Sequence, residues 1–384
     1  MHDDGDDIPR LTAGGPSWYG LRPDSNIGGE VYERMLLERL PAHGIDLILG
    51  LPPDHCVASP PPGWRVDVLP HARGPHWTVA PAVFVPYTLR LLRHRQVGVL
   101  RGPSVRITGP SLLLSRLVAR APVPVVLHHH HTYPRWAQLE AAILKRADAI
   151  VTVSNHSRGQ LISMGVDPNQ VHVVLEGVAR PPATAGWPEA WPLGGLRVLQ
   201  LGRLEARKRP QVAIDALAVA RGQGVEASLV VAGEGPIAQE LVAHARAVGV
   251  GDAVAFLGRV SEPQKWQLYD AADVLMFAST LEGFGLVVAE AQSRGVPVIA
   301  AAGSATAEAF EPDRSGLLAP PVGEAFAACL VRLVDDRLRA AMSAHAAQFA
   351  RRFDWDRCAA EVADLYRAVA QRYCRGRPGG ARRV

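Results

Sequence analysis

The stretch Glu282-Gly-Phe-Gly-Leu-Val-Val-Ala-Glu290 decides the fold of this chain. An apolar run over Val274–Ala278 precedes it and a second apolar run, Pro297–Ala301, follows it, so both runs predict strands. Between the two strands we expect a loop over Ser279–Gly285 and a helix over Leu286–Arg294. This order of strand, loop, helix and strand predicts a βαβ unit of a parallel sheet.

The two glutamates of this stretch lie on either side of the predicted helix start. Glu282 belongs to the loop, and Glu290 lies about one turn inside the helix and points back toward the same place. A helix start at Gly285 presents unpaired backbone N–H groups and the positive end of a dipole, which suits a phosphate. These are the groups that a nucleotide-sugar site needs. A glycine turn before a helix is also a common structural βα turn. The spacing alone therefore leaves both a ligand site and a structural turn open.

Composition limits the class of protein. The 384 residues are 48% hydrophobic and 20% charged, which predicts two domains with sizeable cores. A net charge of +4 is too weak to indicate a nucleic-acid partner. The four cysteines form no CxxC pair and fit buried thiols in a reducing compartment. The acidic N-terminus is unlike a secretory signal and no apolar run is long enough to span a membrane, so we expect a soluble, cytoplasmic protein.

Strand-like and helix-like segments alternate along the chain, which predicts an α/β fold with parallel sheets. The segment 180–195 breaks this pattern with four prolines and three glycines. We therefore expect an N-terminal domain over 1–180 and a C-terminal domain over 196–355, both Rossmann-like and facing a central cleft. A helix over 356–372 should return to the first domain, ahead of a basic, disordered tail at 373–384.

Two weaker features belong to the first half. The first strand is poor in apolar residues, and Ile8–Ala13 is the best candidate for it. The segment Ala82–Arg95 predicts a helix with apolar and arginine-rich sides. Such a helix can lie on a membrane surface, but packing of its apolar side against the core is the simpler interpretation.

Basic and glycine residues follow the predicted strands of the second half. Arg203 and Lys208 come just after the strand Leu196–Leu201, where a forked donor and a point charge suit a diphosphate. Gly233 follows the strand Ser228–Ala232 and permits close approach of a ligand to the backbone. A solvated basic loop and a tight turn are the structural alternatives.

The first half offers two further candidates. Gly28 and Gly29 open the first clear helix, where a phosphate or sugar can approach the backbone. Four histidines, His128-His-His-His131, end the predicted strand Val123–Leu127. Consecutive residues do not face one way and no acidic cluster accompanies them in the sequence, so we expect no metal site. One of these histidines is a candidate for substrate positioning or proton handling.

With these segments in place, the chain resembles the retaining glycosyltransferases of the GT-B fold, family 4. The resemblance covers about residues 20–372 and is strongest in the second half. It is carried by five segments whose order and spacing match the donor half of the family: Gly202–Lys208, Ala232–Pro236, Phe256–Val260, Ala271–Val274 and Glu282–Glu290.

The resemblance implies roles for individual residues of the second half. Arg203 and Lys208 would clamp the donor diphosphate, Glu282 would meet the hydroxyls of the donor sugar, and Glu290 would hold the ribose hydroxyls. Arg259 and Val260 would lie beside the base, and Gly233 belongs to the same donor-binding set. Four residues would offer backbone N–H groups to sugar and phosphate: Gly283, Phe284, Gly285 and Leu286.

In the first half the resemblance implies that Gly28 and Gly29 form a loop over the diphosphate. It also implies that His130 positions the sugar or acceptor, with His129 as the alternative after a slip of one residue. Two departures from the family pattern stand out. Glu176 replaces the usual asparagine of an Asn-Gly-Val segment, and Arg209 stands where glycine is common.

The implied activity is transfer of a hexosyl-type sugar from a UDP- or GDP-sugar to an acceptor hydroxyl, with retained configuration and without a metal or cofactor. The expected acceptor is a small natural product or a saccharide, and membrane contact is not favoured. The alternatives are a membrane-associated transferase with a lipid-linked acceptor, a nucleotide-sugar epimerase or hydrolase, and a non-catalytic binding protein. The sequence does not fix the oligomeric state.

Overall fold

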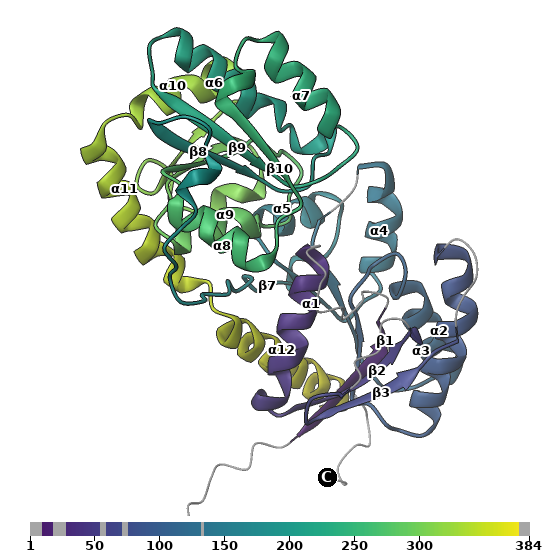
Figure 1. Ribbon diagram of the computed structural model, residues 1–384. Helices are drawn as coiled ribbons and strands as arrows, with labels where there is room; N and C mark the ends of the chain where they lie inside the picture. Colours follow the sequence, from purple (N-terminus) through teal and green to yellow (C-terminus); the bar gives the residue numbers. More distant parts are fainter. Residues whose placement is uncertain (1–9, 18–27, 54–58, 71–75, 132–133, 376–384) are drawn as a thin grey trace, which may run out of the picture. The chain divides into compact units, whose positions relative to one another are not determined.

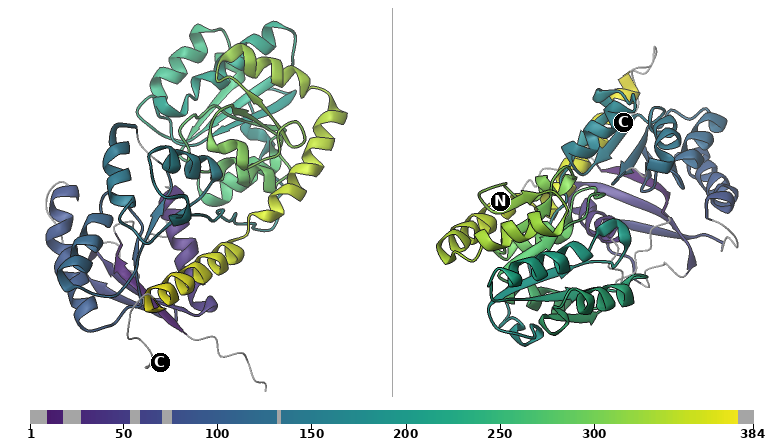
Figure 2. Two further views of the ribbon diagram at one scale, coloured as in Figure 1. Left: turned by 180° about the vertical axis from the view of Figure 1, so that it is seen from behind. Right: turned by 90° about the horizontal axis from the view of Figure 1, so that it is seen from above.

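The computed structural model describes five stretches of the chain, namely 10–17, 28–53, 59–70, 76–131 and 134–375 (Figure 1). These residues form two compact units. The first unit holds the chain up to Gly177 and again from Trp355, and the second holds Val178–Asp354. Each unit contains one parallel sheet with helices on both faces, as the three views show (Figures 1 and 2). The predicted α/β class with two parallel, Rossmann-like sheets is confirmed.

The sheet of the first unit has seven strands. In spatial order they are β3 (Trp64–Val68), β2 (Ile45–Leu51), β1 (Leu11–Pro16), β4 (Val99–Gly102), β5 (Val125–His129), β6 (Ala149–Thr152) and β7 (Val171–Val173). The order of the strands reverses between β1 and β4. Ligands of open α/β sheets bind outside the carboxyl ends of the strands at such a reversal.

Two sets of helices cover this sheet. One face packs against α2 (His76–Arg93), α3 (Gly109–Ala119), α4 (Ala137–Leu144) and α5 (Asn155–Ser163). On the other side, α1 (Gly28–Arg39) packs against the last helix, α12 (Trp355–Arg375). Helix α12 therefore belongs to the first unit, and it continues three residues beyond the predicted end at 372. The remainder of the predicted tail lies outside the described residues.

The first strand is intact but lies later in the chain than predicted. β1 spans Leu11–Pro16, and Ile8 lies outside the described residues. The strand is poor in apolar side chains because it is central and closely packed. A Cβ atom on Gly15 would come within 2.5 Å of the carbonyl oxygen of Arg101, and one on Gly14 within 2.9 Å of the carbonyl oxygen of Ile48. Glycine is therefore what this central position requires.

Helix α2 packs with its apolar side inward, as the simpler interpretation predicted. Phe84, Leu91 and Leu92 are buried, whereas Arg90 and Arg93 are exposed. In the described part of the chain, no helix has the length and hydropathy needed to cross a membrane.

The sheet of the second unit has six strands. In spatial order they are β10 (Val254–Gly258), β9 (Ala227–Ala232), β8 (Leu196–Leu201), β11 (Val274–Phe277), β12 (Val298–Ala301) and β13 (Gly316–Ala319). The order reverses between β8 and β11. The stretch from Val274 to Ala301 forms the predicted βαβ unit and borders this reversal.

Helices also cover both faces of the second sheet. One core joins the sheet to α6 (Gln211–Gly222), α7 (Ala238–Ala247) and α10 (Gly323–Arg332). The remaining helices of this unit are α8 (Glu262–Ala271), α9 (Leu286–Ser293) and α11 (Asp336–Phe349). The strand β13 and the helices α10 and α11 are not among the elements expected from the sequence. The segment 180–195 packs on this unit, because Trp191 is buried and its indole N–H donates to the carbonyl oxygen of Val198 at 2.8 Å.

Candidate functional site

The reversal between β8 and β11 brings a cation and a carboxylate together. Lys208 ends a short 3-10 helix, Ala206–Lys208, in the loop after β8, and Glu282 lies in the loop after β11. Their Nζ and Oε1 atoms are 2.9 Å apart, and the side chains are 15% and 16% exposed. The two loops are adjacent because β8 pairs with β11 in the sheet. Two residues 74 positions apart thus meet where a parallel sheet binds its ligand.

Two arginines of the β8 loop share one carboxylate. Glu205 binds Arg203 at 2.7 Å through one oxygen and Arg207 at 2.7 Å through the other. Arg207 also donates to the carbonyl oxygen of Leu281, next to Glu282, at 3.3 Å. Arg203 remains more than half exposed and can turn toward a ligand. Glu205 and Arg207 are not among the residues predicted from the sequence, although both lie within the Gly202–Lys208 segment.

The start of α9 requires glycine. Gly285 is the residue before the helix and has φ 105°, and a Cβ atom there would lie 2.9 Å from the Thr306 side chain. Phe284 is buried, with its ring 5.1 Å from that of Phe353. The Phe284 side chain is therefore committed to the core, and only its backbone can serve a ligand. The N–H groups of Val288 and Ala289 donate to the carbonyl oxygen of Gly285, so the donors that α9 can offer a ligand come from its first residues, which begin at Leu286.

Glu290 is held by two residues of α8 that the sequence analysis missed. Its carboxylate accepts from Lys265 Nζ at 2.7 Å and from Tyr269 Oη at 2.9 Å. Burial opposes the charge on Lys265, but Glu290 and Glu262 outweigh it, so the pKa of Lys265 is raised. Burial, together with Glu290, also raises the pKa of Tyr269 well above its ordinary value. A carboxylate has about four lone-pair sites, so Glu290 can accept further hydroxyls.

The loops after β9 and β10 adjoin this region. A Cβ atom on Gly233 would lie 1.9 Å from the carbonyl oxygen of Gly202. The glycine is thus explained by contact between two loops of the protein, while its part in donor binding stays a prediction. Gly233 also donates to the carbonyl oxygen of Gly258, which leads into Arg259 and Val260. Arg259 lies 3.9 Å from Glu234, and both side chains are exposed.

Arg209 ends the β8 loop in a left-handed conformation, with φ 50° and ψ 46°. This geometry favours glycine, since a side chain there costs about 1–2 kcal/mol. It explains why glycine suits this position.

In the first unit, Gly28 and Gly29 are the first two residues of α1. The segment 18–27, which connects β1 to this helix, lies outside the described residues. The proposed contact of the glycine pair with a phosphate therefore stays a prediction.

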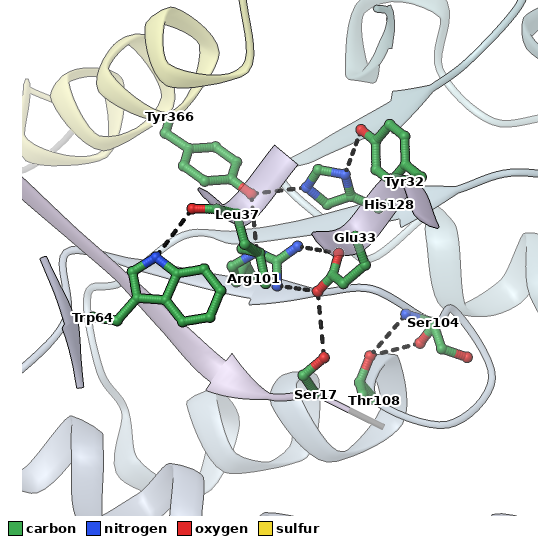
Figure 3. Close-up of polar contacts among 10 residues, drawn as sticks. All are labelled: Ser17, Tyr32, Glu33, Leu37, Trp64, Arg101, Ser104, Thr108, His128 and Tyr366. Carbon is green, nitrogen blue, oxygen red and sulfur yellow. Dashed lines mark hydrogen bonds and ion pairs between the residues drawn. The ribbon is translucent and has the colours of Figure 1, made fainter. Parts of the chain in front are cut away.

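The histidine run divides between the two faces of the first sheet. His128 and His129 are part of β5, so their side chains point to opposite faces. His128 contacts Tyr32 of α1 at 3.2 Å and Tyr366 of α12 at 2.8 Å, as Figure 3 shows. His129 instead lies 4.0 Å from Glu140 of α4. Burial, with neighbouring positive groups, lowers the pKa of His128 well below 6.5 and that of His129 to about 3.

His130 follows the strand and is the less enclosed of the two candidate histidines. Its side chain is 15% exposed, compared with 2% for His129. The ring packs edge-on against Tyr32, with 4.5 Å between centroids, and Nδ1 lies 3.5 Å from Glu176. This exposure supports His130 over His129. Among the described residues, no group of three or more possible ligands is arranged to hold a metal, although Glu140 and Glu176 approach the histidines.

A buried ion pair lies beside His128 (Figure 3). Arg101 of β4 donates to both carboxylate oxygens of Glu33 of α1 at 2.6 and 2.8 Å, and both side chains are 1% exposed. Arg101 also donates to Tyr366 Oη at 3.3 Å. The network joins α1, β4, β5 and α12. The sequence gives no local signal for this network, because residues that bond directly, such as Arg101 and Tyr366, lie up to 265 positions apart.

Two family models match most of the chain. The model "Glycosyl transferases group 1" matches residues 187–351, and the model "Glycosyltransferase Family 4" matches residues 27–180. The two matched ranges do not overlap, and both contain candidate residues.

Curated relatives and solved structures agree with these matches. The D-inositol 3-phosphate glycosyltransferase of Acidothermus cellulolyticus is 34% identical over 61% of this chain and 56% of its own length. That of Salinispora tropica is 35% identical over 60% and 53%. The chain thus spans just over half the length of these relatives.

Two solved structures show the same fold over 94% of this chain and 100% of theirs. Anabaena HepE in complex with UDP and glucose has a TM-score of 0.73 at 19% identity. Sucrose-phosphate synthase from Thermosynechococcus elongatus has a TM-score of 0.75 at 22% identity.

Proposed function

This chain belongs to the GT-B glycosyl transferases of group 1 and family 4, and we propose that it moves a hexosyl-type sugar from a nucleotide-diphosphate sugar to an acceptor hydroxyl. The observation that carries the proposal is the pairing of Lys208 with Glu282 at the reversal of the second sheet. A cation for the diphosphate and a carboxylate for sugar hydroxyls lie side by side there. The start of α9 adds backbone donors to the same place.

The proposed reaction retains the configuration at the anomeric carbon. The bond from that carbon to the diphosphate oxygen breaks, and a bond to the acceptor oxygen forms on the same face. The leaving phosphate oxygen takes the proton of the acceptor hydroxyl. Negative charge grows on the diphosphate as the bond breaks, and Arg203, Lys208 and the N–H groups at Gly285 and Leu286 stabilise it. In this proposal these protein groups act without a metal ion.

The other candidates hold the donor. Glu282 accepts from the hydroxyls of the sugar, and Glu290 accepts from the hydroxyls of the ribose. The backbone N–H groups of Gly283, Phe284 and Gly285 bind sugar and phosphate oxygens. In the first unit, His130 positions the sugar or the acceptor. Because the proposed retaining mechanism uses the leaving phosphate as the base, His130 need not remove a proton.

The names of the relatives support the proposed chemical class of the substrates. HepE is known in complex with UDP and with UDP-glucose, which supports a UDP-sugar donor. A GDP-sugar is the alternative, since the described donor candidates bind phosphate, sugar and ribose groups that both donors share. The curated relatives are named for D-inositol 3-phosphate. We therefore propose a small soluble acceptor with several hydroxyls, such as a saccharide, a natural product or a phosphorylated cyclitol.

The test is turnover by single variants. Wild-type protein is incubated with UDP- and GDP-sugars and a panel of such acceptors, and products are identified by mass spectrometry. Lys208→Ala and Arg203→Ala should each lower kcat by about 10²–10³-fold, the usual cost of removing a donor to developing charge. Arg337→Ala is the matched control, because Arg337 is an exposed cation of the same unit.

Wild-type rates in both variants would contradict the assignment of the diphosphate site. Rapid release of nucleotide from the donor without any acceptor would instead indicate a hydrolase. Binding of the donor with no turnover on any acceptor would favour a non-catalytic role.

A further inference from the structure

Glu176 is a buried carboxylate outside the donor site of the second unit. It lies three residues beyond the end of β7 and is 5% exposed. Its Oε1 atom lies 3.5 Å from Nδ1 of His130. Burial of a carboxylate is costly unless a partner compensates, and the basic side chain placed beside this one is His130.

The backbone holds Glu176 in this place. The next residue, Gly177, lies so close to the start of α12 that a Cβ atom on it would come within 2.4 Å of the Trp355 backbone nitrogen. The Trp355 ring in turn lies 5.9 Å from the ring of Tyr32. Glycine at 177 thus permits the approach of α12 that fixes the chain next to Glu176.

Tyr32 supports the opposite side of the histidine. Its ring meets His130 edge-on at an interplanar angle of 77°. Its hydroxyl forms a hydrogen bond with His128, and His128 forms another with Tyr366 (Figure 3). Tyr32 is fully buried, so it cannot follow a displaced histidine. The His130 ring therefore lies between the buried ring of Tyr32 and the Glu176 carboxylate.

The ring nitrogens of His130 differ in their surroundings. Nδ1 is buried, and the structure gives it no hydrogen-bond partner. The Glu176 carboxylate at 3.5 Å is beyond hydrogen-bond distance, but a small rotation of either side chain closes the gap. Catalytic hydrogen bonds are often long in unliganded proteins and tighten when substrate binds.

We propose that Glu176 is a positioning residue for His130. Its carboxylate accepts the Nδ1–H of the imidazole and so leaves Nε2 as the nitrogen that meets the sugar or acceptor hydroxyl. A carboxylate that accepts one ring N–H fixes both the tautomer and the orientation of a histidine. This inference rests on the proposed role of His130 and deepens it, because it specifies the nitrogen used and the group that selects it.

A purely structural role for Glu176 makes a different prediction. Loss of a buried carboxylate changes stability whether or not His130 is present, whereas loss of a positioning contact matters only through His130. The variants Glu176→Ala, Glu176→Gln, His130→Ala and the double variant Glu176→Ala/His130→Ala separate the two. Glutamine is the conservative variant, because its side-chain oxygen accepts the same N–H.

We expect Glu176→Ala to lower kcat by about 10–100-fold, the usual effect of removing a group that orients a functional histidine. The KM for the donor should stay unchanged, and Glu176→Gln should recover most of the activity. The double variant should be no slower than His130→Ala, since coupled residues do not add. Circular dichroism and thermal unfolding show whether each variant is folded.

A second readout does not depend on turnover. Nitrogen-15 NMR of the full chain labelled at histidine reports which nitrogen of His130 carries the proton, with His130→Ala identifying the signal. We expect the Nδ1–H tautomer in the wild type and in Glu176→Gln, and a mixture or the other tautomer in Glu176→Ala. This result can hold even if the proposed transfer reaction fails, so the two failures are distinguishable.

Three outcomes would overturn the inference. One is an equal loss from Glu176→Ala with and without His130. Another is wild-type kcat in Glu176→Ala while His130→Ala is impaired, or wild-type kcat in His130→Ala itself. The third is the same tautomer of His130 in the wild type and in Glu176→Ala.

Discussion

The polar groups at the carboxyl ends of the two sheets differ in how exposed they are to solvent. In the second unit, oppositely charged side chains pair at partly exposed positions, as Lys208 does with Glu282 at about one-sixth exposure. In the first unit, Arg101 and Glu33 are 1% exposed and the tyrosines and His128 around them are fully buried. A partly exposed pair can exchange its partner for a ligand at modest cost, whereas a buried pair cannot.

The difference assigns different tasks to the two regions. The charged pairs of the second unit are groups that a phosphate or sugar hydroxyl can bind. The network of the first unit holds helices and strands in place around His130. Substitutions in the second region should change ligand binding, and substitutions in the first should change stability or the position of one histidine.

The largest effect should come from breaking the buried ion pair. Arg101→Met leaves Glu33 buried without its cation, which typically costs about 3–5 kcal/mol of unfolding free energy. Denaturant unfolding followed by circular dichroism measures it. The double variant Arg101→Met/Glu33→Leu is the control, because it removes both charges and should recover most of the loss. A loss below about 1 kcal/mol in the single variant would refute the assigned role.

A smaller effect is expected when Glu290, the carboxylate proposed to bind the ribose, loses its charge. Glu290→Gln should weaken nucleotide binding by about 10–100-fold, since hydrogen bonds to a charged group contribute about 1.5–3 kcal/mol. Calorimetric titration with UDP and GDP measures it. Glu262→Gln is the matched control, because Glu262 also binds Lys265, at 2.8 Å, but is half exposed. Equal weakening in both variants would show that Lys265, rather than the ribose, explains the effect.

The sequence predicted much of the second unit and less of the first. The βαβ unit around Glu282, and the loop with Arg203 and Lys208, could be identified because each contains its groups within a few residues. The partners of those groups were missed where they come from another element, as with Lys265 and Tyr269 for Glu290. Such contacts depend on helix packing and leave no local pattern.

In the first unit almost every important contact joins distant segments. Arg101 and Tyr366 meet although 265 positions separate them, and Glu176 reaches His130 from the far side of β6. The first strand was misplaced because its glycines serve close packing and give no apolar signal. The strand β13 and the helices α10 and α11 carry none of the candidate site residues.

The pH dependence of the free energy of unfolding should show that His129 is neutral in the folded protein. The folded protein keeps His129 neutral, with its pKa lowered to about 3 by burial and by His130 and His131. Its contribution is therefore complete above pH 6.5 and is lost as the pH falls toward 3, by about 1.4 kcal/mol per pH unit. In His129→Asn the free energy of unfolding, measured by urea titration from pH 7 to 5, should fall less steeply by that amount. An unchanged slope would contradict a neutral, buried His129.

Glu140, which faces His129 and lies 3.0 Å from Arg106, should act in the opposite direction. Burial raises its pKa to about 7, and Arg106 opposes this shift only in part. The folded protein thus gains stability from Glu140 as the pH falls from 7 to 4.5. The variant Glu140→Gln should lose stability more steeply in this range than the wild type, by about 1.4 kcal/mol per pH unit. A shallower slope than that of the wild type would contradict the raised pKa.

The smallest expected effect is a gain in the free energy of unfolding, and it should be similar in the two units. Arg209 in the second unit and Arg120 in the first both have left-handed backbones, with φ of 50° and 49°. Replacement of either by glycine should stabilise its unit by about 0.5–1 kcal/mol, because relief of strain exceeds the added flexibility of the unfolded chain. Thermal unfolding compares the two variants. Destabilisation by Arg209→Gly alone would show that the Arg209 side chain makes a contact worth more than the strain.

The most direct test of the proposed donor site is calorimetric titration of the full chain with UDP and GDP. The wild type should bind at least one of these nucleotides, and Lys208→Ala should weaken that binding at least tenfold, while Arg337→Ala leaves it unchanged. A tenfold change corresponds to about 1.4 kcal/mol, less than one charge-assisted hydrogen bond commonly contributes. Equal affinity in the wild type and Lys208→Ala, or no binding of either nucleotide, would contradict a diphosphate site at the reversal of the second sheet.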